Sequence, residues 1–250
     1  MLHFDHPLSE RVRSLIRIEH LFNRFKHTLA GEDKWSHHVA IGSLFEIMEC
    51  SSRADLKLEI LQELERQRQI ISRNQANNPV LDRLNQATQN LQEIQQKFGQ
   101  HIRENEWLMA LKQRFAVAGG TTPVELPSYY FWQKQAAEQR RQDLETWSQA
   151  MMPTYQATEL LLEILRSHAL TSECQANKGN YQHNSMAHNI HLLTIEIPMG
   201  ENALPEVSAN KYFTHIRFLS TDQNSMRGKQ IERNIKFKMM MCSFDPIPNK

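Results

Sequence analysis

Three stretches near the C-terminal end decide the fold: residues 191–197 read HLLTIEI, residues 211–219 read KYFTHIRFL and residues 231–242 read IERNIKFKMMMC. In each stretch apolar and polar residues alternate with a period of two, which is typical of a half-buried β-strand. Residues 180–186 are a weaker candidate of the same kind. These patterns predict a small antiparallel β domain over residues 171–250, with the last ~8 residues as a candidate disordered tail.

Upstream of these strands, apolar residues recur at steps of three and four, as on one face of a helix. Ser9 is the expected N-cap of the first helix. Residues 53–74 and 80–100 predict two long polar helices with narrow apolar stripes, either an antiparallel hairpin of coiled-coil type or an ordinary amphipathic pair in a bundle. Further helices are expected over residues 36–50, 104–115, 128–152 and from 153 to about 168. The predicted class is therefore α+β: a mainly helical domain over residues 1–170, a bundle with a long helical hairpin, followed by the β domain.

The overall composition excludes several classes of protein. Lys and Arg total 29 against 28 Asp and Glu, so a net charge of +1 gives no general attraction to nucleic acid or membrane. The three cysteines, Cys50, Cys174 and Cys242, are too far apart for a disulfide framework or a zinc signature. No signal peptide and no apolar run of ~18 residues is found. We expect a cytoplasmic protein with no membrane partner.

Motifs of catalysis and metal binding are missing from the sequence. Gly119-Gly120 lacks the Lys-Ser/Thr of a phosphate-binding loop, and no Gly-x-Ser-x-Gly elbow is found. His183, His188 and His191 have no cysteine or carboxylate at ligand spacing. Glu63 and Glu65, beside Arg66 and Arg68, are interpreted as surface salt-bridge partners. We therefore expect no enzyme, no cofactor and no metal, although catalytic residues far apart in sequence stay an open alternative.

Positive charge is concentrated late in the chain and on the first helix. Residues 226–238 carry five basic residues against one acidic residue. Lys236 and Lys238 fall on one face of their strand, and Arg217 is expected on the neighbouring strand. We predict that the two strands pack their apolar face on the helices and hold a basic face outward. Such a face favours an acidic partner, and a merely solvated face is the alternative.

Five segments of the chain carry a resemblance to a known family. In order, they are FDHPLSERVRSLIRIEHL (4–21), ELERQR (63–68), LKQRFAVAGGTTPVELPSYYFW (111–132), DLETW (143–147) and IRF (216–218). Together they resemble the ZapD family of cell division proteins. The first and third are specific, whereas the others are weak alone. The resemblance extends over about residues 4–242.

The resemblance implies a cytoplasmic, non-enzymatic protein at the midcell division ring, without a cofactor. Members of the family have a helical domain followed by a β domain and form symmetric homodimers. They bind the C-terminal tail of the tubulin-like GTPase FtsZ and bundle its filaments. The alternative from another class is a nucleic-acid-binding module that uses the basic sheet face, although the near-neutral chain has no motif of that class.

We expect a basic groove with apolar walls to hold the FtsZ tail. Arginine is the preferred cation there because its guanidinium forks onto carboxylates. Arg13, Arg17, Arg114 and Arg217 match arginines in the family's motifs and are expected to converge on this groove. Arg227, Arg233, Lys236 and Lys238 are expected to extend it, and Trp132 to form an aromatic wall. The strand NIKFKMMMC is more basic than in relatives, which leaves the roles of Lys236 and Lys238 open.

Overall fold

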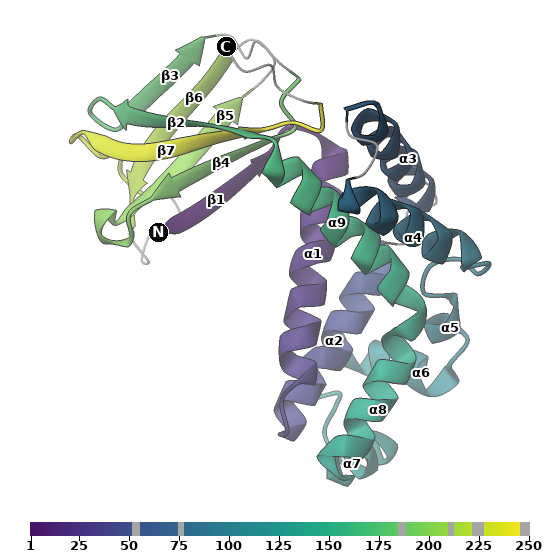
Figure 1. The fold of residues 1–250 in the computed structure, drawn as a ribbon. Coiled ribbons are helices and arrows are strands. Elements are labelled where there is room, and N and C mark those ends of the chain that lie inside the picture. The colour runs from purple at the N-terminus through teal and green to yellow at the C-terminus, as the bar shows by residue number, and fades with distance from the viewer. Residues whose placement is uncertain (52–55, 75–77, 185–188, 210–212, 222–227, 246–250) are drawn as a thin grey trace. The chain divides into compact units, whose positions relative to one another are not determined.

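The computed structural model describes residues 1–51, 56–74, 78–184, 189–209, 213–221 and 228–245. They form two compact units, a helical one over Ser14–Leu161 and a strand-rich one that combines Met1–Arg13 with Leu162–Lys250. Helices dominate the first part of the chain and antiparallel strands the last part (Figure 1), which confirms the α+β class.

The helices form largely where the apolar periodicity predicts them. The first helix, α1, begins after Ser9, whose Oγ accepts a hydrogen bond from the Val12 N–H at 3.3 Å. This confirms the predicted cap. Pro127, rather than a capping Ser128, opens the helix of the aromatic segment. The helices are α1 (Glu10–Leu29), α2 (Lys34–Cys50), α3 (Leu56–Asn74), α4 (Pro79–Glu93), α5 (Gln100–Arg103), α6 (Glu106–Phe115), α7 (Pro127–Lys134), α8 (Ala137–Ser148) and α9 (Met152–Ser167), with a short 3-10 turn, η1, over Gln149–Met151.

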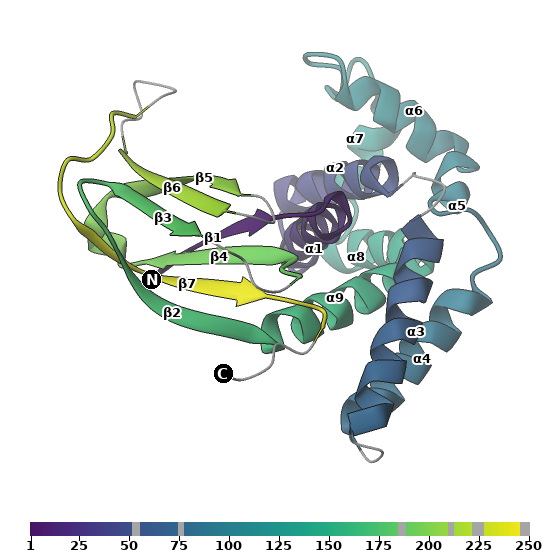
Figure 2. The same cartoon turned by 90° about the horizontal axis from the view of Figure 1, so that it is seen from above.

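The predicted helical hairpin is formed by α3 and α4, which lie side by side (Figure 2). Leu64 on α3 and Leu84 and Leu91 on α4 are fully buried. However, α4 ends at Glu93 and does not reach residue 100. Ile94 leaves the helix in an extended conformation, and its carbonyl oxygen accepts a hydrogen bond from Lys57 Nζ at 2.6 Å. Residues 94–100, which were predicted to continue this helix, therefore lie outside α4.

A buried arginine links α2, α7 and α8 within the helical unit. Arg140 is only 5% exposed and donates hydrogen bonds to His37 Nδ1 at 2.9 Å and to the Glu32 carbonyl oxygen at 2.7 Å. It also donates to the carbonyl oxygens of Gln133 and Gln135. These bonds satisfy the guanidinium in a place where an unpaired charge would be very costly.

The strand-rich unit contains two antiparallel sheets, with strand orders β1-β4-β7-β2 and β3-β6-β5. The four predicted strands are found as β3, β4, β6 and β7, whereas β1, β2 and β5 were not predicted. Residues 222–228, expected to be a hairpin connection, lie almost entirely outside the described residues. The strands are β1 (Leu2–Pro7), β2 (Ala169–Ala176), β3 (Asn180–Asn184), β4 (Leu192–Ile197), β5 (Ala203–Ala209), β6 (Phe213–Ser220) and β7 (Ile235–Cys242).

The two sheets share one hydrophobic core. Ile216 and Phe218 of β6 belong to the same buried cluster as Phe237 and Met239 of β7. The rings of Phe218 and Phe237 have centroids 5.1 Å apart. The prediction that the apolar faces of these strands pack on the helices is therefore wrong, because they pack on each other.

The first strand brings the N-terminal residues into the strand-rich unit. β1 pairs antiparallel with β4, with Leu2 opposite Ile197. Asp5 of β1 accepts a hydrogen bond from Thr194 Oγ1 at 2.6 Å and pairs with Arg166 at 3.2 Å. The two compact units divide the chain after Arg13 and before Leu162.

The chain beyond β7 is described as far as Asp245. Ser243 and Phe244 are buried, and the Phe244 N–H donates to His191 Nδ1 at 3.3 Å. The rest of the expected tail, residues 246–250, lies outside the described residues.

Candidate partner-binding site

Arg114 is exposed at the C-terminal end of α6 in the helical unit. Its Nη1 lies 3.3 Å from Glu125 Oε2, in an ion pair of which both side chains are nearly half exposed. Arg17 is exposed on α1, one helical turn after Arg13, whose Nε lies 3.2 Å from Glu10 Oε2. These arginines are accessible to a partner.

Arg217 lies in the middle of β6 and is exposed. The strand register places it opposite Glu206 of β5, and Arg217 Nε donates to Glu206 Oε2 at 2.9 Å. Lys238 of β7 lies opposite Glu173 of β2, with 3.7 Å between Nζ and Oε1. Cross-strand pairs of opposite charge stabilise a sheet modestly.

Arg233 precedes β7 and forms two hydrogen bonds with Glu201. Its guanidinium donates to the carboxylate and to the carbonyl oxygen of Glu201. Arg233 thus holds the turn before β5 as well as offering a positive charge at the surface.

The predicted single basic sheet face is not formed. Arg217 on β6 and Lys236 and Lys238 on β7 all point away from the shared core. β6 and β7 belong to different sheets that face each other across that core, so these cations lie on opposite outer faces of the unit. The alternative of a nucleic-acid-binding module was based on a single basic sheet face, and the structure does not contain that face among the described residues.

The predicted site residues are divided between the two units. Arg17, Arg114 and Trp132 belong to the helical unit, and Arg13, Arg217, Arg233, Lys236 and Lys238 to the strand-rich unit. Arg227 lies outside the described residues. The convergence of Arg13, Arg17, Arg114 and Arg217 on one groove therefore stays a prediction.

Trp132 lies in a cluster of three tryptophans. Its Nε1 donates to Asp143 Oδ2 at 2.8 Å, which fixes the indole. The centroid of Trp147 lies 5.9 Å from that of Trp132 and 5.5 Å from that of Trp107. The cluster borders a shallow pocket of about 330 Å³ lined by Trp107, Ser128, Phe131, Trp132, Gln135 and Trp147.

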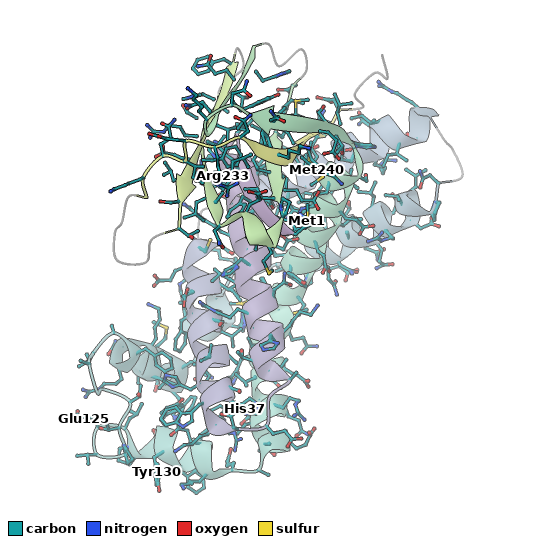
Figure 3. All side chains as sticks on the ribbon, turned by 90° about the vertical axis from the view of Figure 1, so that its left-hand side faces the viewer. Met1, His37, Glu125, Tyr130, Arg233 and Met240 are labelled. Carbon is teal, nitrogen blue, oxygen red and sulfur yellow. The ribbon has the colours of Figure 1, made fainter. Side chains whose placement is uncertain are left out.

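Phe131 is the exposed aromatic residue of this pocket, with 70% of its surface accessible. Large aromatic side chains are usually buried, and those at a surface are frequent anchors of interfaces. Glu125 and Tyr130, on either side of the start of α7, are labelled at the same end of the helical unit in Figure 3. The run of four aromatics at 129–132 was visible in the sequence, but the tryptophans that join it from α6 and α8 were not.

The two carboxylates of the ELERQR segment are ion-paired, as predicted. Glu65 binds Arg68 at 2.7 Å, and hydrogen bonds from Arg68 and Gln69 lower its pKa to about 2. Glu63 binds Arg66 at 3.0 Å but is 1% exposed, so its expected position at the surface is wrong. These contacts give the pair a structural role.

The described residues contain neither a metal-binding cluster nor a membrane-spanning helix. No three His, Cys, Asp or Glu side chains are grouped so that they could hold a metal ion in the part of the chain that the structure describes. Among the same residues, none of the helices is both long and apolar enough to span a bilayer.

Comparison with known proteins identifies the family. The family model described as "ZapD: Cell division protein" matches residues 16–217. The chain belongs to the ZapD family. The cell division protein ZapD of Chromobacterium violaceum is 41% identical to it, over 98% of this chain and the whole of that protein. The ZapD of Azoarcus sp. strain BH72 is 40% identical, over 97% of this chain and the whole of that protein. As a ZapD-family member the chain is a non-enzymatic cell division protein.

Proposed function

We propose that this ZapD-family chain forms a cytoplasmic homodimer that binds the C-terminal tail of FtsZ. The dimer cross-links and bundles FtsZ filaments and so promotes assembly of the division ring at midcell. The observation that carries the proposal is the set of exposed arginines held by exposed glutamates, with Arg114–Glu125 and Arg217–Glu206 as the clearest pairs.

These ion pairs suit a binding site in which a carboxylate of the ligand replaces the glutamate that pairs with the arginine in the free protein. An exposed pair contributes only ~0–1 kcal/mol to stability, so an incoming carboxylate replaces the glutamate at small cost. Until then the glutamate holds the long arginine side chain in place, which reduces the entropy lost on binding. A tail that contains acidic residues is the chemistry that such arginines recognise.

Two sites in one dimer explain bundling without tight single contacts. A filament presents many tails, so the second tail binds a dimer that is already held close to it. The effective concentration of that second event raises the overall affinity well above that of one contact. A monomer with one site binds a filament but does not connect two.

Co-sedimentation tests the proposal directly. The protein should pellet with filaments of full-length FtsZ and remain in the supernatant with filaments that lack the tail. Arg217→Glu should reduce pelleting, because it replaces a cation that would bind the acidic tail by a second negative charge beside Glu206, which would repel the tail. Arg68→Glu on α3, outside the proposed site, is the control.

Three results would contradict the proposal. Equal pelleting with tail-deleted FtsZ would show that the tail is not the ligand. If Arg68→Glu reduced pelleting as much as Arg217→Glu, with unchanged circular dichroism, Arg217 would have no specific role in binding. A monomeric mass in solution at working concentration would exclude cross-linking by a dimer.

A further inference from the structure

We infer that the helical unit holds a binding site for a small amphiphile, a molecule with a carboxylate headgroup and an aliphatic chain. The site is a cavity beside the segment that joins α4 to α5, here called the α4–α5 cavity. Its volume is about 530 Å³, within the range of cavities that bind small molecules. Its lining residues all fall within Ser14–Leu161, so the site belongs to the helical unit alone.

The α4–α5 cavity exists because α4 ends early. Leu91 and Phe98 are seven residues apart and both line the cavity, but the helix that holds Leu91 ends at Glu93. Residues 94–99 then connect α4 to α5 without forming a helix (Figure 2). A second cavity of about 210 Å³ borders the same segment. Because protein interiors are close-packed, this much space beside one segment makes it a candidate ligand site.

One wall of the cavity is largely aliphatic. Leu56 at the start of α3 and Leu91 near the end of α4 are 5% and 0% exposed. Ile94 and Phe98 of the connecting segment are half-buried and line the same space. A flexible aliphatic chain suits such a wall, and each CH₂ group that leaves water for it strengthens binding about fourfold.

The charged residues that line the cavity are all basic. They are Lys57, Lys97 and Arg103, and no Asp or Glu lines the cavity among the residues that the structure describes. Glu49 at the end of α2 is not a lining residue, and its carboxylate pairs with Lys112 at 2.6 Å. A site with this charge favours an anionic headgroup and disfavours a cationic one.

Two of the three cations are fixed by the connecting segment. Lys57 Nζ donates a hydrogen bond to the Ile94 carbonyl oxygen at 2.6 Å. Arg103 Nη1 donates one to the Phe98 carbonyl oxygen at 2.8 Å. Lysine has three N–H donors and arginine five, so each cation keeps donors for a ligand. The guanidinium of Arg103 can fork onto both oxygens of a carboxylate.

Arg103 and Ser51 lie at the same end of the cavity. Gly99 packs on Met48 of α2, since a Cβ at Gly99 would lie 2.5 Å from Met48 Cγ and 3.4 Å from Arg103 Nη1. Ser51 follows Met48 by three residues, lines the cavity and is 1% exposed. Its Oγ has no hydrogen-bond partner in the described part of the chain. A buried hydroxyl without a partner is costly, and a headgroup oxygen that accepts its hydrogen bond removes this cost.

The test is the binding of decanoate to the full-length protein, measured by calorimetry below the concentration at which decanoate forms micelles. We expect one decanoate per chain. Octanoate, which is two CH₂ groups shorter, should bind roughly tenfold more weakly. Decanol has the same chain without the charge and should also bind about tenfold more weakly. Decyltrimethylammonium should not bind.

Three variants test the headgroup end. Lys97→Glu should weaken decanoate binding about tenfold, and because Lys97 is exposed, its replacement tests binding rather than folding. Arg73→Glu, at an exposed position of α3 outside the cavity, is the matched control and should keep the wild-type affinity. Ser51→Ala removes the unpartnered hydroxyl, so it should weaken binding without lowering the melting temperature of the free protein.

Several results would overturn the inference. Equal affinity for decanoate, decanol and decyltrimethylammonium would show an unselective apolar surface. Equal weakening by Lys97→Glu and Arg73→Glu would show a general effect of charge, and wild-type affinity in Ser51→Ala would exclude the headgroup from that end. Absence of decanoate binding would exclude the site altogether. None of these results bears on FtsZ binding, because the experiment contains no FtsZ.

Discussion

At the scale of single residues, we expect His37 and His38 to make the stability of the helical unit depend on pH. His38 Nδ1 lies 2.8 Å from the Tyr129 hydroxyl, and its ring stacks on Phe115 with centroids 4.5 Å apart. Burial lowers the pKa of His38 below the usual 6.5. Burial, and secondly the charge of Arg140, lower the pKa of His37 in the same direction.

We expect stability to fall on acidification because of these histidines. As the pH drops below about 6.5, histidine in the unfolded chain takes up a proton before the folded one does, so protonation favours unfolding. The stabilisation is complete above the unfolded pKa and is lost as the pH falls through the lower folded pKa. Thermal unfolding followed by circular dichroism between about pH 8 and pH 5 measures this loss.

His38→Gln should flatten this pH profile. His27→Gln, at an exposed position of α1, is the matched control and should keep the wild-type profile. A melting temperature that rises as the pH falls would show that the histidines do not act in this way.

At the scale of elements, Arg140 holds α7 and α8 to the loop before α2. Replacing it by leucine leaves three carbonyl oxygens and His37 Nδ1 without their donor. We expect Arg140→Leu to lower the free energy of unfolding by about 3–5 kcal/mol. The neighbouring Arg141 pairs with Glu138 near the surface, so Arg141→Leu should cost less than about 1 kcal/mol. Urea unfolding of both variants tests this, and equal losses would contradict it.

The period-two pattern of the sequence predicted β4, β6 and β7 but missed β1, β2 and β5. Burial does not separate the two groups, because β5 alternates between buried and exposed residues whereas β4 is buried along nearly its whole length. β5 contains Pro205, which weakens a strand prediction. Alternation shows which residues of a strand are buried, but not against which sheet they pack. The assignment of Arg217 and Lys236 to one face failed for this reason.

The sequence predicted the exposed arginines of the candidate site but not the glutamates with which they form ion pairs. Arg217 and Glu206 are eleven residues apart, and only the register of β5 and β6 brings them together. The same holds for Trp107 and Trp147, which meet Trp132 only through the packing of α6, α7 and α8. Contacts of this kind depend on tertiary structure, and local patterns do not contain them.

At the scale of the whole molecule, bundling should depend strongly on salt. The proposed contacts are between exposed charges, and such contacts weaken as the Debye length falls from ~10 Å at 0.1 M salt towards ~3 Å at 1 M. Light scattering of FtsZ filaments with the protein should therefore decrease as salt is added. The mass of the protein alone, measured over the same range, shows whether the dimer persists. Bundling that does not change with salt would indicate an apolar contact instead.

The pairing of β1 with β4 also orders events during synthesis of the chain. The ribosome makes β1 first, but its hydrogen-bonding partner emerges only after the entire helical unit has been translated. Ser14–Leu161 can therefore fold while translation continues, since it forms a compact unit from one continuous segment. Both edges of β1 stay unpaired until β4 has been translated, so a nascent chain that stalls before β4 exposes an unpaired strand to other nascent chains.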